Sequence, residues 1–365
     1  MRIEKDALGE MPLPDGAYYG IQAFRSLSNF DVTDKTFNDY PAVVRALAEI
    51  KKACALANRD IGALGADKAG AIARACDDIL EGRMEGQFPV NIWRGGGTSI
   101  NMNLNEVIAN RANELLTGHK GYEQVHPNTH VNMCQSSNDV YPTAENIVLY
   151  RETGRALEGV AALENSFARK SKEFGGVVRL GRTCLQDGVP MTLGQVFAGF
   201  HGVIRRSRER LEALREGFRV GVLGGTVIGT GLGVLPGYVE AVYPHLSAIV
   251  GFEMRLPDTP EGSPVSDAGL FDAMQNADGL LTLSGALKVL ACSAGKIAND
   301  FRLLSSGPRS GFGEIRLPAV APGSSIMPGK INPFMCDLVV QIMHQVAAND
   351  WAITMNASAS DLDLA

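Results

Sequence analysis

Apolar side chains recur at helical spacing over most of the chain beyond residue 40. Residues 1–40 are rich in Gly, Pro, Asp and aromatic residues, and we predict irregular structure there. Strand signals are few and short. The predicted helices cover about 41–58, 66–82, 99–116, 141–173, 193–216, 266–304 and 334–355. Because these helices are apolar over much of their girth, the pattern predicts a mostly α fold, a bundle of long helices that also makes subunit contacts.

The helix boundaries carry ordinary start and stop signals. Three glycines, 95–97, break the chain ahead of the third helix, Gly118 follows the end of the same helix, and Gly217 follows the end of the helix 193–216. Pro142 falls in the first turn of the longest early helix, where a proline is tolerated. Thr192 is the expected cap of the helix that follows it.

Four hydroxyl-rich segments stand beside glycine or proline hinges and precede or open helices. Each segment alone is explained by helix capping, because Ser, Thr and Asn are the preferred capping residues. Together they suggest a converging anion site of hydroxyls, amides, helix N-termini and one lysine. The segments are Thr98-Ser99, Ser136-Ser137-Asn138, Thr183, and Ser324-Ser325 with Lys330 and Asn332.

Residues 323–333, Gly-Ser-Ser-Ile-Met-Pro-Gly-Lys-Ile-Asn-Pro, form the most informative of these segments. A phosphate loop is excluded, because five residues separate Gly323 from Gly329 and Ile331 replaces the metal-binding hydroxyl. A second glycine-rich stretch, 221–237, lacks the third glycine and the βαβ context of a dinucleotide site. Pro333 fits the first turn of the following helix, which would bring Lys330 and Asn332 to its N-terminus.

Composition narrows the class of protein without identifying it. The chain of 365 residues is 45% hydrophobic and 20% charged, with a net charge of −6, so nucleic acid and anionic membranes are not favoured partners. No signal region is evident, and we expect no membrane-spanning stretch. The six histidines show no metal-binding grouping. The cysteines form no C-x-x-C pair and are expected to be reduced thiols in the cytoplasm: Cys54, Cys76, Cys134, Cys184, Cys292 and Cys336.

The segment 323–332 resembles the signature of the aspartase/fumarase superfamily of lyases. Segments 98–106, 135–139, 181–183 and 305–309 match further family segments in the same order, so the resemblance covers nearly the whole chain. Residues 17–20 and 97–99 are closest to the aspartate ammonia-lyase branch. By contrast, residues 136–138 and 310–315 are closer to class II fumarase.

The resemblance implies elimination of ammonia from L-aspartate to give fumarate through an aci-carboxylate intermediate, without a redox cofactor. Ser324, as its alkoxide, would be the base, and loop N–H groups with Lys330 would lower the pKa of its hydroxyl. The substrate β-carboxylate would be held by Thr98, Ser136, Ser137 and Ser325. The α-carboxylate would be held by Thr183, Lys330 and Asn332, while Asn138 would contact the amino group.

Two departures from the family pattern affect these expectations. Cys184 stands where relatives carry a histidine or glutamine that helps to bind the leaving amine, and a thiol is a poor hydrogen-bond partner. Residues 356–365 resemble the start of a further central helix, so a truncated chain without a small C-terminal domain is expected. The resemblance then divides the chain into an N-terminal lyase domain, 1–138, and a central helical bundle, 139–365.

The family builds each site from three subunits of a homotetramer, and we expect the same assembly here. Three alternatives to an aspartate ammonia-lyase remain open at this point. They are a fumarase that hydrates fumarate to malate, a lyase for a substituted or quaternary amine, and an inactive assembly or binding protein.

Overall fold

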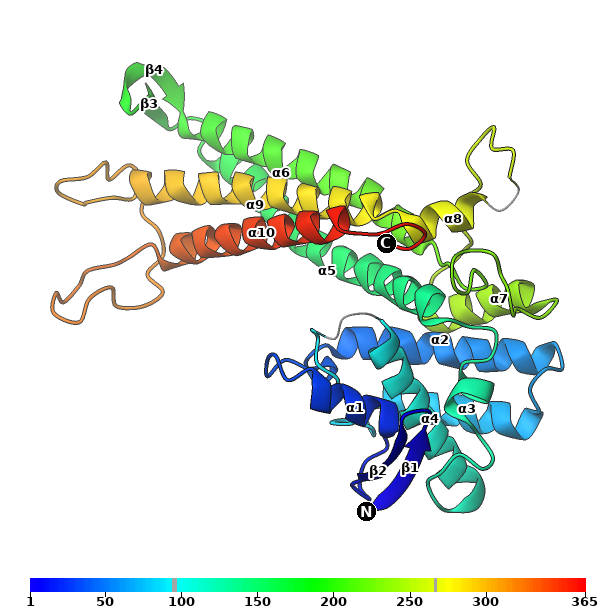
Figure 1. The fold of residues 1–365 in the computed structure, drawn as a ribbon. Helices are drawn as coiled ribbons and strands as arrows, with labels where there is room; N and C mark the ends of the chain where they lie inside the picture. The colour runs from blue at the N-terminus through cyan, green and yellow to red at the C-terminus, as the bar shows by residue number, and fades with distance from the viewer. Residues whose placement is uncertain (94–96, 266–267) are drawn as a thin grey trace. The chain divides into compact units, whose positions relative to one another are not determined.

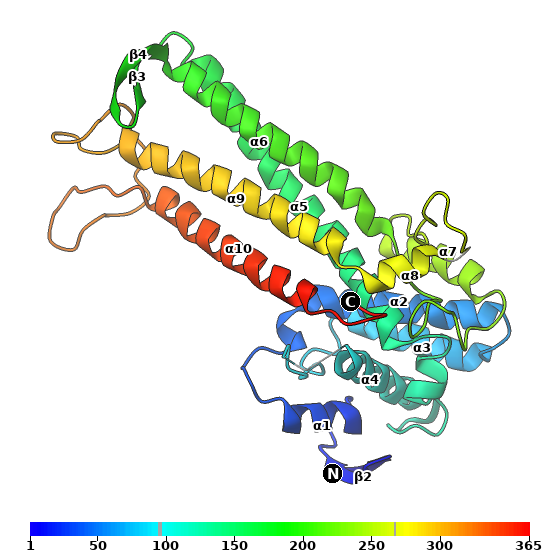
Figure 2. The same cartoon turned by 45° about the horizontal axis from the view of Figure 1, so that its top comes forward.

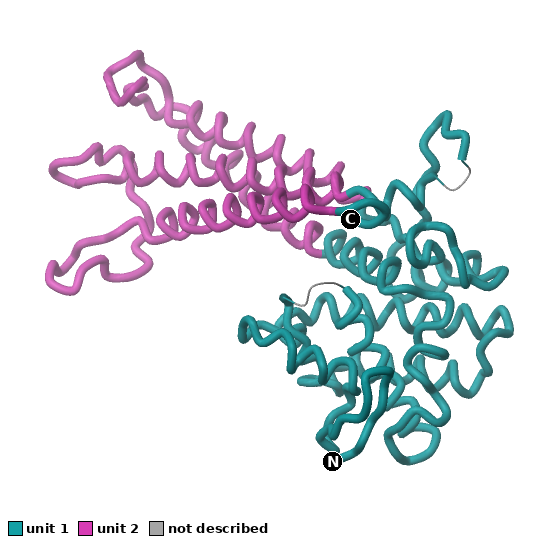
Figure 3. The backbone as a smooth tube through the Cα atoms, viewed as in Figure 1, with its two compact units in different colours: residues 1–151, 218–276, 361–365 teal, residues 152–217, 277–360 magenta. Residues whose placement is uncertain are grey.

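The structure is a computed structural model that describes residues 1–93, 97–265 and 268–365. The expected mostly α fold is confirmed (Figure 1). By compactness the chain forms two units, drawn in separate colours in Figure 3. Unit 1 contains residues 1–151, 218–276 and 361–365, and unit 2 contains residues 152–217 and 277–360. The expected domain division at residue 138 follows the family pattern along the sequence and stays a prediction.

Unit 1 is a cluster of helices with one β-hairpin. Helix α2 packs against α3 and α7, and α3 packs against α4. Buried alanines along α2, among them Ala46, Ala53 and Ala57, let neighbouring backbones approach closely. The helices of this unit are α1 (Ile21–Asn29), α2 (Pro41–Asp60), α3 (Ala66–Leu80), α4 (Thr98–Thr117), α7 (Tyr238–Val250) and α8 (Ala268–Gln275). It also contains short helical turns at Phe37–Asp39 and Pro127–Val131, and a third turn, Glu216–Arg219, crosses from unit 2 into unit 1.

Unit 2 is a bundle of long helices that lie side by side in Figures 1 and 2. Helix α9 (Asp278–Leu304) packs against α10 (Phe334–Ser358) on one side and against α6 (Leu193–Arg215) on another. Helix α5 (Ser137–Glu173) begins in unit 1 and continues into this bundle. Phe167, Phe197, Phe200 and Phe301 form its aromatic core, with ring centroids between 5.6 and 6.4 Å apart.

Two of the predicted helix ends hold, those marked by Thr192 and Gly118. Thr192 caps α6 in a reciprocal pair of hydrogen bonds with Gln195. Gly118 ends α4 with a positive φ of 85°. The expectation that Pro142 lies in the first turn of its helix was wrong, because α5 begins at Ser137, about one turn earlier than predicted, and Pro142 lies inside the helix. Pro333 is the N-cap of α10, one position ahead of the helix. Glycines 95 and 96 lie outside the described residues.

The prediction of irregular structure over residues 1–40 was wrong. Strands β1 (Arg2–Asp6) and β2 (Gly9–Leu13) form an antiparallel hairpin, and α1 follows them. The start of α1 is capped by distant Glu106, whose carboxylate accepts the backbone N–H groups of Gly20, Gln22 and Ala23 at 2.8–3.1 Å. Burial raises the pKa of Glu106 to about 8. A cap supplied from another helix leaves no local signal at residue 20.

Three further elements differ from the predictions. Residues 181–187, which fall in none of the predicted helices, belong to the hairpin β3 (Val178–Thr183) and β4 (Gln186–Thr192). Helix α7 was not predicted at all. The single helix expected over 266–304 is divided at Asn276, whose side-chain amide bonds back to Asp272 at the end of α8. The expected start at Ser266 lies outside the described residues.

The expectation of no stretch apolar enough to span a membrane was wrong for α9. Its 27 residues include an 18-residue window of mean hydropathy 1.4, which satisfies the length and composition of a spanning helix. In the structure α9 packs against α6 and α10, and 28% of that window is buried within the chain. One helix of suitable length and hydropathy does not by itself identify a membrane-spanning protein.

Candidate active site

A cavity of about 350 Å³ in unit 1 brings together three of the predicted substrate-binding residues. Thr98 lies at the start of α4, and Ser136 and Ser137 lie at the start of α5. Two helix N-termini thus meet at one cavity, and the positive ends of their dipoles favour an anion there. The other lining residues are Gln22, Asn101, Met102, Asn128, Asn132, Cys134, Gln135, Thr226, Val227, Leu232 and Gly233.

The start of α5 is fixed by a local hydrogen-bond pattern. The hydroxyl of Ser136 accepts the N–H of Asn138 at 3.2 Å, and Asp139 Oδ1 accepts the N–H of Ser136 at 2.8 Å. The side-chain amide of Asn138 donates to the carbonyl oxygen of Val227 at 2.9 Å. This bond orients the Asn138 side chain at the glycine-rich segment 221–237 and leaves its amide oxygen as an acceptor.

Asp139 is a site-supporting residue that the sequence did not identify. Its carboxyl group is fully buried, and Oδ2 accepts the backbone N–H groups of Gly224 and Thr226 at 3.3 and 3.0 Å. Thr226 lines the cavity and has a positive φ of 55°, which is uncommon for a β-branched residue. Burial raises the pKa of Asp139 to about 7. Asp139 therefore holds the glycine-rich segment against the start of α5.

In unit 2 the predicted base, Ser324, lies on the segment that connects α9 to α10. Its hydroxyl oxygen accepts the backbone N–H groups of Ile326 and Met327 at 3.3 and 3.0 Å. Ser324 is half-buried, whereas Ser325 and Lys330 are exposed. Two N–H donors aimed at one oxygen would stabilise negative charge on that oxygen.

The two ends of this loop are joined to each other. The N–H of Gly323 donates to the carbonyl of Lys330 at 2.8 Å, and the side-chain amide of Asn332 donates to the carbonyl of Gly323 at 2.8 Å. A Cβ on Gly323 would lie 2.7 Å from Asn332 Cγ, so only glycine fits there. Gly329 supplies a positive φ of 81° within the loop. The loop is therefore a closed unit that presents Ser324, Ser325 and Lys330.

Thr183 and Cys184 lie at the turn of the β3–β4 hairpin, and both are exposed. Cys184 and Leu185 have positive φ values of 52° and 61°, as a two-residue hairpin turn requires. Such turns favour Asn-Gly or Asp-Gly, so this turn is strained by its two bulky residues. The strained turn projects the Cys184 thiol into solvent.

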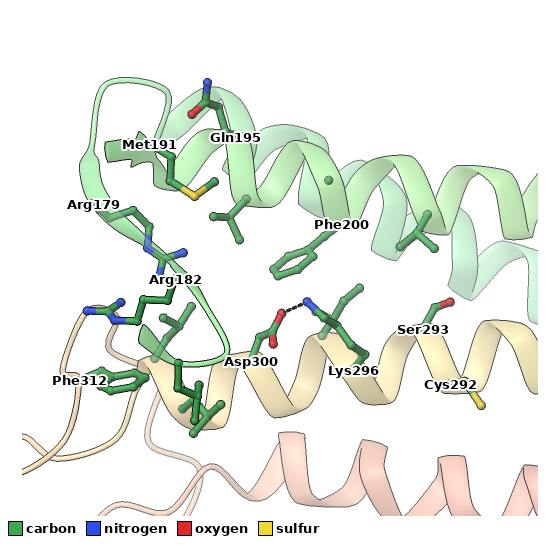
Figure 4. A pocket seen from close by; sticks show the side chains of 17 residues that line it. Arg179, Arg182, Met191, Gln195, Phe200, Cys292, Ser293, Lys296, Asp300 and Phe312 are labelled. Carbon is green, nitrogen blue, oxygen red and sulfur yellow. Dashed lines mark hydrogen bonds and ion pairs between the residues drawn. The ribbon is translucent and has the colours of Figure 1, made fainter. Parts of the chain in front are cut away.

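A larger cavity of about 730 Å³ in unit 2 contains none of the predicted site residues among its described lining (Figure 4). Arg179 and Arg182 of β3 both pair with Glu314, which lies on the connection after α9. The Arg182 guanidinium also lies over the ring of Phe312, at 4.6 Å from its centroid. These contacts join the β3–β4 hairpin to the connection that carries Ser324.

The predicted site residues are thus divided between the units. Thr98, Ser136, Ser137 and Asn138 belong to unit 1, whereas Thr183, Cys184, Ser324, Ser325, Lys330 and Asn332 belong to unit 2. Within residues 1–93, 97–265 and 268–365, no three His, Cys, Asp or Glu side chains are grouped as metal ligands. The chemistry available in the described groups is carboxylate binding by hydroxyls, amides and a lysine, next to a serine oxygen with two N–H donors.

Comparison with known proteins identifies the family of enzymes to which this long-helix bundle belongs. Residues 9–348 match the lyase family. The chain is 44% identical to the aspartate ammonia-lyase of a Bacillus species and 42% identical to the class II fumarate hydratase of Ralstonia nicotianae. Both alignments cover 100% of this chain, and they cover 76% and 77% of the relatives, respectively.

A solved structure agrees with these sequence relatives. The fumarate lyase:delta crystallin of Brucella melitensis, bound to cobalt, superimposes with a TM-score of 0.93 at 46% identity. The match covers 100% of this chain and 77% of that one. The chain belongs to the lyase family, within the aspartase/fumarase superfamily. The chain spans about three quarters of the length of these relatives, and this coverage does not support the expected truncation.

Proposed function

We propose that this protein is an ammonia-lyase that converts L-aspartate to fumarate and ammonia. The observation that carries the proposal is the position of Ser324, whose oxygen accepts two N–H groups within a closed loop of the family signature. The similarity to aspartate ammonia-lyases at 44% identity supports the same substrate. The activity is that of a carbon–nitrogen lyase.

In the proposed reaction the Ser324 alkoxide takes a proton from the carbon next to the β-carboxylate. The C–H electron pair moves into that carboxylate, which becomes a dianionic aci-carboxylate, while the serine becomes a neutral hydroxyl. The pair then returns to form the carbon–carbon double bond as the C–N bond breaks and the amine leaves. Stabilising the dianion is the largest demand on the site. The N–H groups of Ile326 and Met327 act at an earlier stage, because they stabilise the Ser324 alkoxide before it takes the proton.

The substrate contacts follow from the same proposal. Thr98, Ser136, Ser137 and Ser325 hold the β-carboxylate, and Thr183, Lys330 and Asn332 hold the α-carboxylate. Asn138 contacts the amino group, and its orientation supports that role. Because its amide nitrogen donates to Val227, its amide oxygen is left to accept a hydrogen bond from the substrate ammonium.

We infer that the active form is a homotetramer in which subunits share sites. The described part of α10 supports this, because only Cys336 and Asp350 are buried along it while large apolar side chains are exposed. An apolar surface of this kind favours association. The exposed side chains are Met335, Leu338, Ile342, Trp351, Ile353 and Met355. A cytoplasmic location stays a prediction.

A class II fumarase is the second candidate, because a fumarate hydratase relative is 42% identical. Cys184 adds a third candidate, a lyase for a substituted amine. Fumarate absorbance distinguishes them when the full chain is given L-aspartate, L-malate or N-substituted aspartates in separate reactions. We expect fumarate from L-aspartate, and consumption of fumarate that requires added ammonia. If fumarate forms from L-malate and from neither L-aspartate nor its N-substituted derivatives, the protein is a fumarase and the proposal is wrong.

A further inference from the structure

A buried lysine lies beneath the unit 1 cavity. Lys51 of α2 is fully buried and has no carboxylate partner among the described residues. Its ammonium instead donates to the amide oxygens of Asn132 at 2.9 Å and Gln135 at 2.8 Å. Both amides line the cavity, whereas the ammonium does not. A buried ammonium held only by neutral amides is costly, so its position calls for a reason beyond packing.

Lys51 determines which end of the Asn132 amide faces it. An ammonium group only donates hydrogen bonds, so the Asn132 atom that accepts its hydrogen bond must be the amide oxygen. The nitrogen of the same amide donates to the Gln135 carbonyl at 3.0 Å, which agrees with this orientation. Asn132 Oδ1 also receives the side-chain N–H groups of Asn101 and Asn105, each at 3.1 Å.

The orientation of Asn132 then fixes Asn101 and, through it, Ser137. Because Asn132 presents oxygen, Asn101 must present its NH₂ group, which also donates to the Ser137 hydroxyl at 3.0 Å. The Ser137 oxygen is thereby used as an acceptor, and its own proton is free to point into the cavity that it lines. Asn101 is 1% exposed, and its Oδ1 has no partner among the described residues.

We propose that Lys51 is a positioning residue for carboxylate binding, acting through Asn132 and Asn101 to make Ser137 a hydrogen-bond donor to the ligand. The inference rests on the proposed function, because it takes the cavity to hold a carboxylate of the substrate. A hydroxyl that is oriented as a donor before the ligand binds needs no reorganisation when negative charge develops on that carboxylate.

The surroundings of Lys51 predict that dicarboxylate affinity depends on pH. The ionisable groups that influence the ammonium are Asp139 of α5, Cys54 of the same helix and Cys76 of α3. Burial lowers the pKa of Lys51 to about 8. The ammonium is therefore charged below this pH and loses its charge above it. Affinity for a dicarboxylate should fall above about pH 8 in the unsubstituted chain, and a chain without Lys51 should lack this fall.

Calorimetric binding of succinate, an unreactive dicarboxylate, tests the inference on the full chain. Lys51→Met keeps the length of the side chain and removes the donor and the charge. Lys52→Met is the matched control, because Lys52 pairs with Asp77 at 2.6 Å outside this network. We expect succinate affinity about tenfold weaker in Lys51→Met, unchanged in Lys52→Met, and less than twofold weaker when Lys51→Met is added to Ser137→Ala.

Each contrary outcome has a separate meaning. An equal loss from Lys51→Met with and without Ser137 would overturn the inference and leave the proposed function standing. No succinate binding by the unsubstituted chain would overturn the inference together with the dicarboxylate site. If Lys51→Met does not fold, Asn101→Leu interrupts the same route. It should weaken succinate binding about tenfold with Ser137 present and not with Ser137→Ala, and equal losses would again overturn the inference.

Discussion

The side-chain amide of Asn332 donates a hydrogen bond to the carbonyl oxygen of Gly323, and the donor and acceptor atoms are 2.8 Å apart. The two residues stand at opposite ends of the loop that carries Ser324, so this bond closes the loop. It is possible only because position 323 has no side chain, since Asn332 fills the space that a Cβ would need. The reacting serine is thus placed by a contact at the base of its loop.

Gly323→Ala should therefore reduce turnover far more than it reduces stability. The new methyl group displaces Asn332, and a misplacement of Ser324 by about 1 Å is enough to cost roughly 100-fold in kcat. The loop is largely exposed, so the thermal midpoint should change little. Steady-state kinetics and thermal unfolding measure the two effects. Gly159→Ala, where a Cβ meets nothing within 4 Å, is the control. Equal activity of the two variants would contradict the role given to the Gly323–Asn332 contact.

Asp139→Asn should change the pH dependence of stability. Between about pH 4 and 7 the folded chain binds a proton at Asp139 and the unfolded chain does not, so this residue makes the free energy of unfolding fall as pH rises. Asparagine does not titrate. The stability difference between the unsubstituted chain and the variant should therefore shrink by about 1–2 kcal/mol from pH 6 to pH 8.

Urea unfolding followed by circular dichroism at several pH values measures that difference. Asp67→Asn, on the exposed start of α3, provides the comparison. A stability difference for Asp139→Asn that stays constant from pH 6 to pH 8 would show that Asp139 is ionised in the folded chain throughout this range.

Cys184→His should improve the use of aspartate. The imidazole can hydrogen-bond a leaving amine, which a thiol does poorly, and such a bond to a charged group is worth about a tenfold gain in kcat/KM. Histidine is also among the residues that tolerate the positive φ of this position. Cys292→His, at an exposed thiol on α9, is the control. An unchanged or lower kcat/KM would remove Cys184 from the amine pocket and favour another substrate.

Assembly through α10 predicts that a charge on its exposed apolar face separates the subunits. Trp351 is 67% exposed in the single chain, and Trp351→Glu would require an unpaired carboxylate to be buried between subunits. Light scattering during size-exclusion chromatography should show a tetramer for the unsubstituted chain and smaller species for this variant. Leu8→Glu, in the turn between β1 and β2, should remain tetrameric. A monomeric unsubstituted chain would contradict sharing of sites between subunits.

Local signals explain which parts of the fold were predictable. Thr192 and Gly118 mark helix ends by their own chemistry, and the structure has those ends where the sequence put them. Helix α1 is capped by a carboxylate more than 80 residues away, so its start has no local mark. The β3–β4 hairpin turns through Cys184-Leu185 rather than through a glycine pair, which hid two strands in an apparent loop.

The same distinction holds for the candidate site. Its hydroxyl-bearing segments were visible because capping residues and glycine or proline hinges stand together in the sequence. Asp139 and Lys51 were missed because their roles depend on distant partners, residues 224–226 for Asp139 and residues 132–135 for Lys51. An aspartate in a helix start and a lysine in an alanine-rich helix are unremarkable without those contacts.

The role of Ser324 as the base is tested by the rate of fumarate formation from L-aspartate, measured for Ser324→Ala beside the unsubstituted chain. Removing the hydroxyl removes the base, while the N–H groups of Ile326 and Met327 lose only an exposed acceptor. We predict fumarate from the unsubstituted chain, a loss of at least about 1000-fold in kcat for Ser324→Ala, and the same oligomeric size and thermal midpoint for both. A near-normal rate for the variant would contradict the assignment of Ser324 as the base.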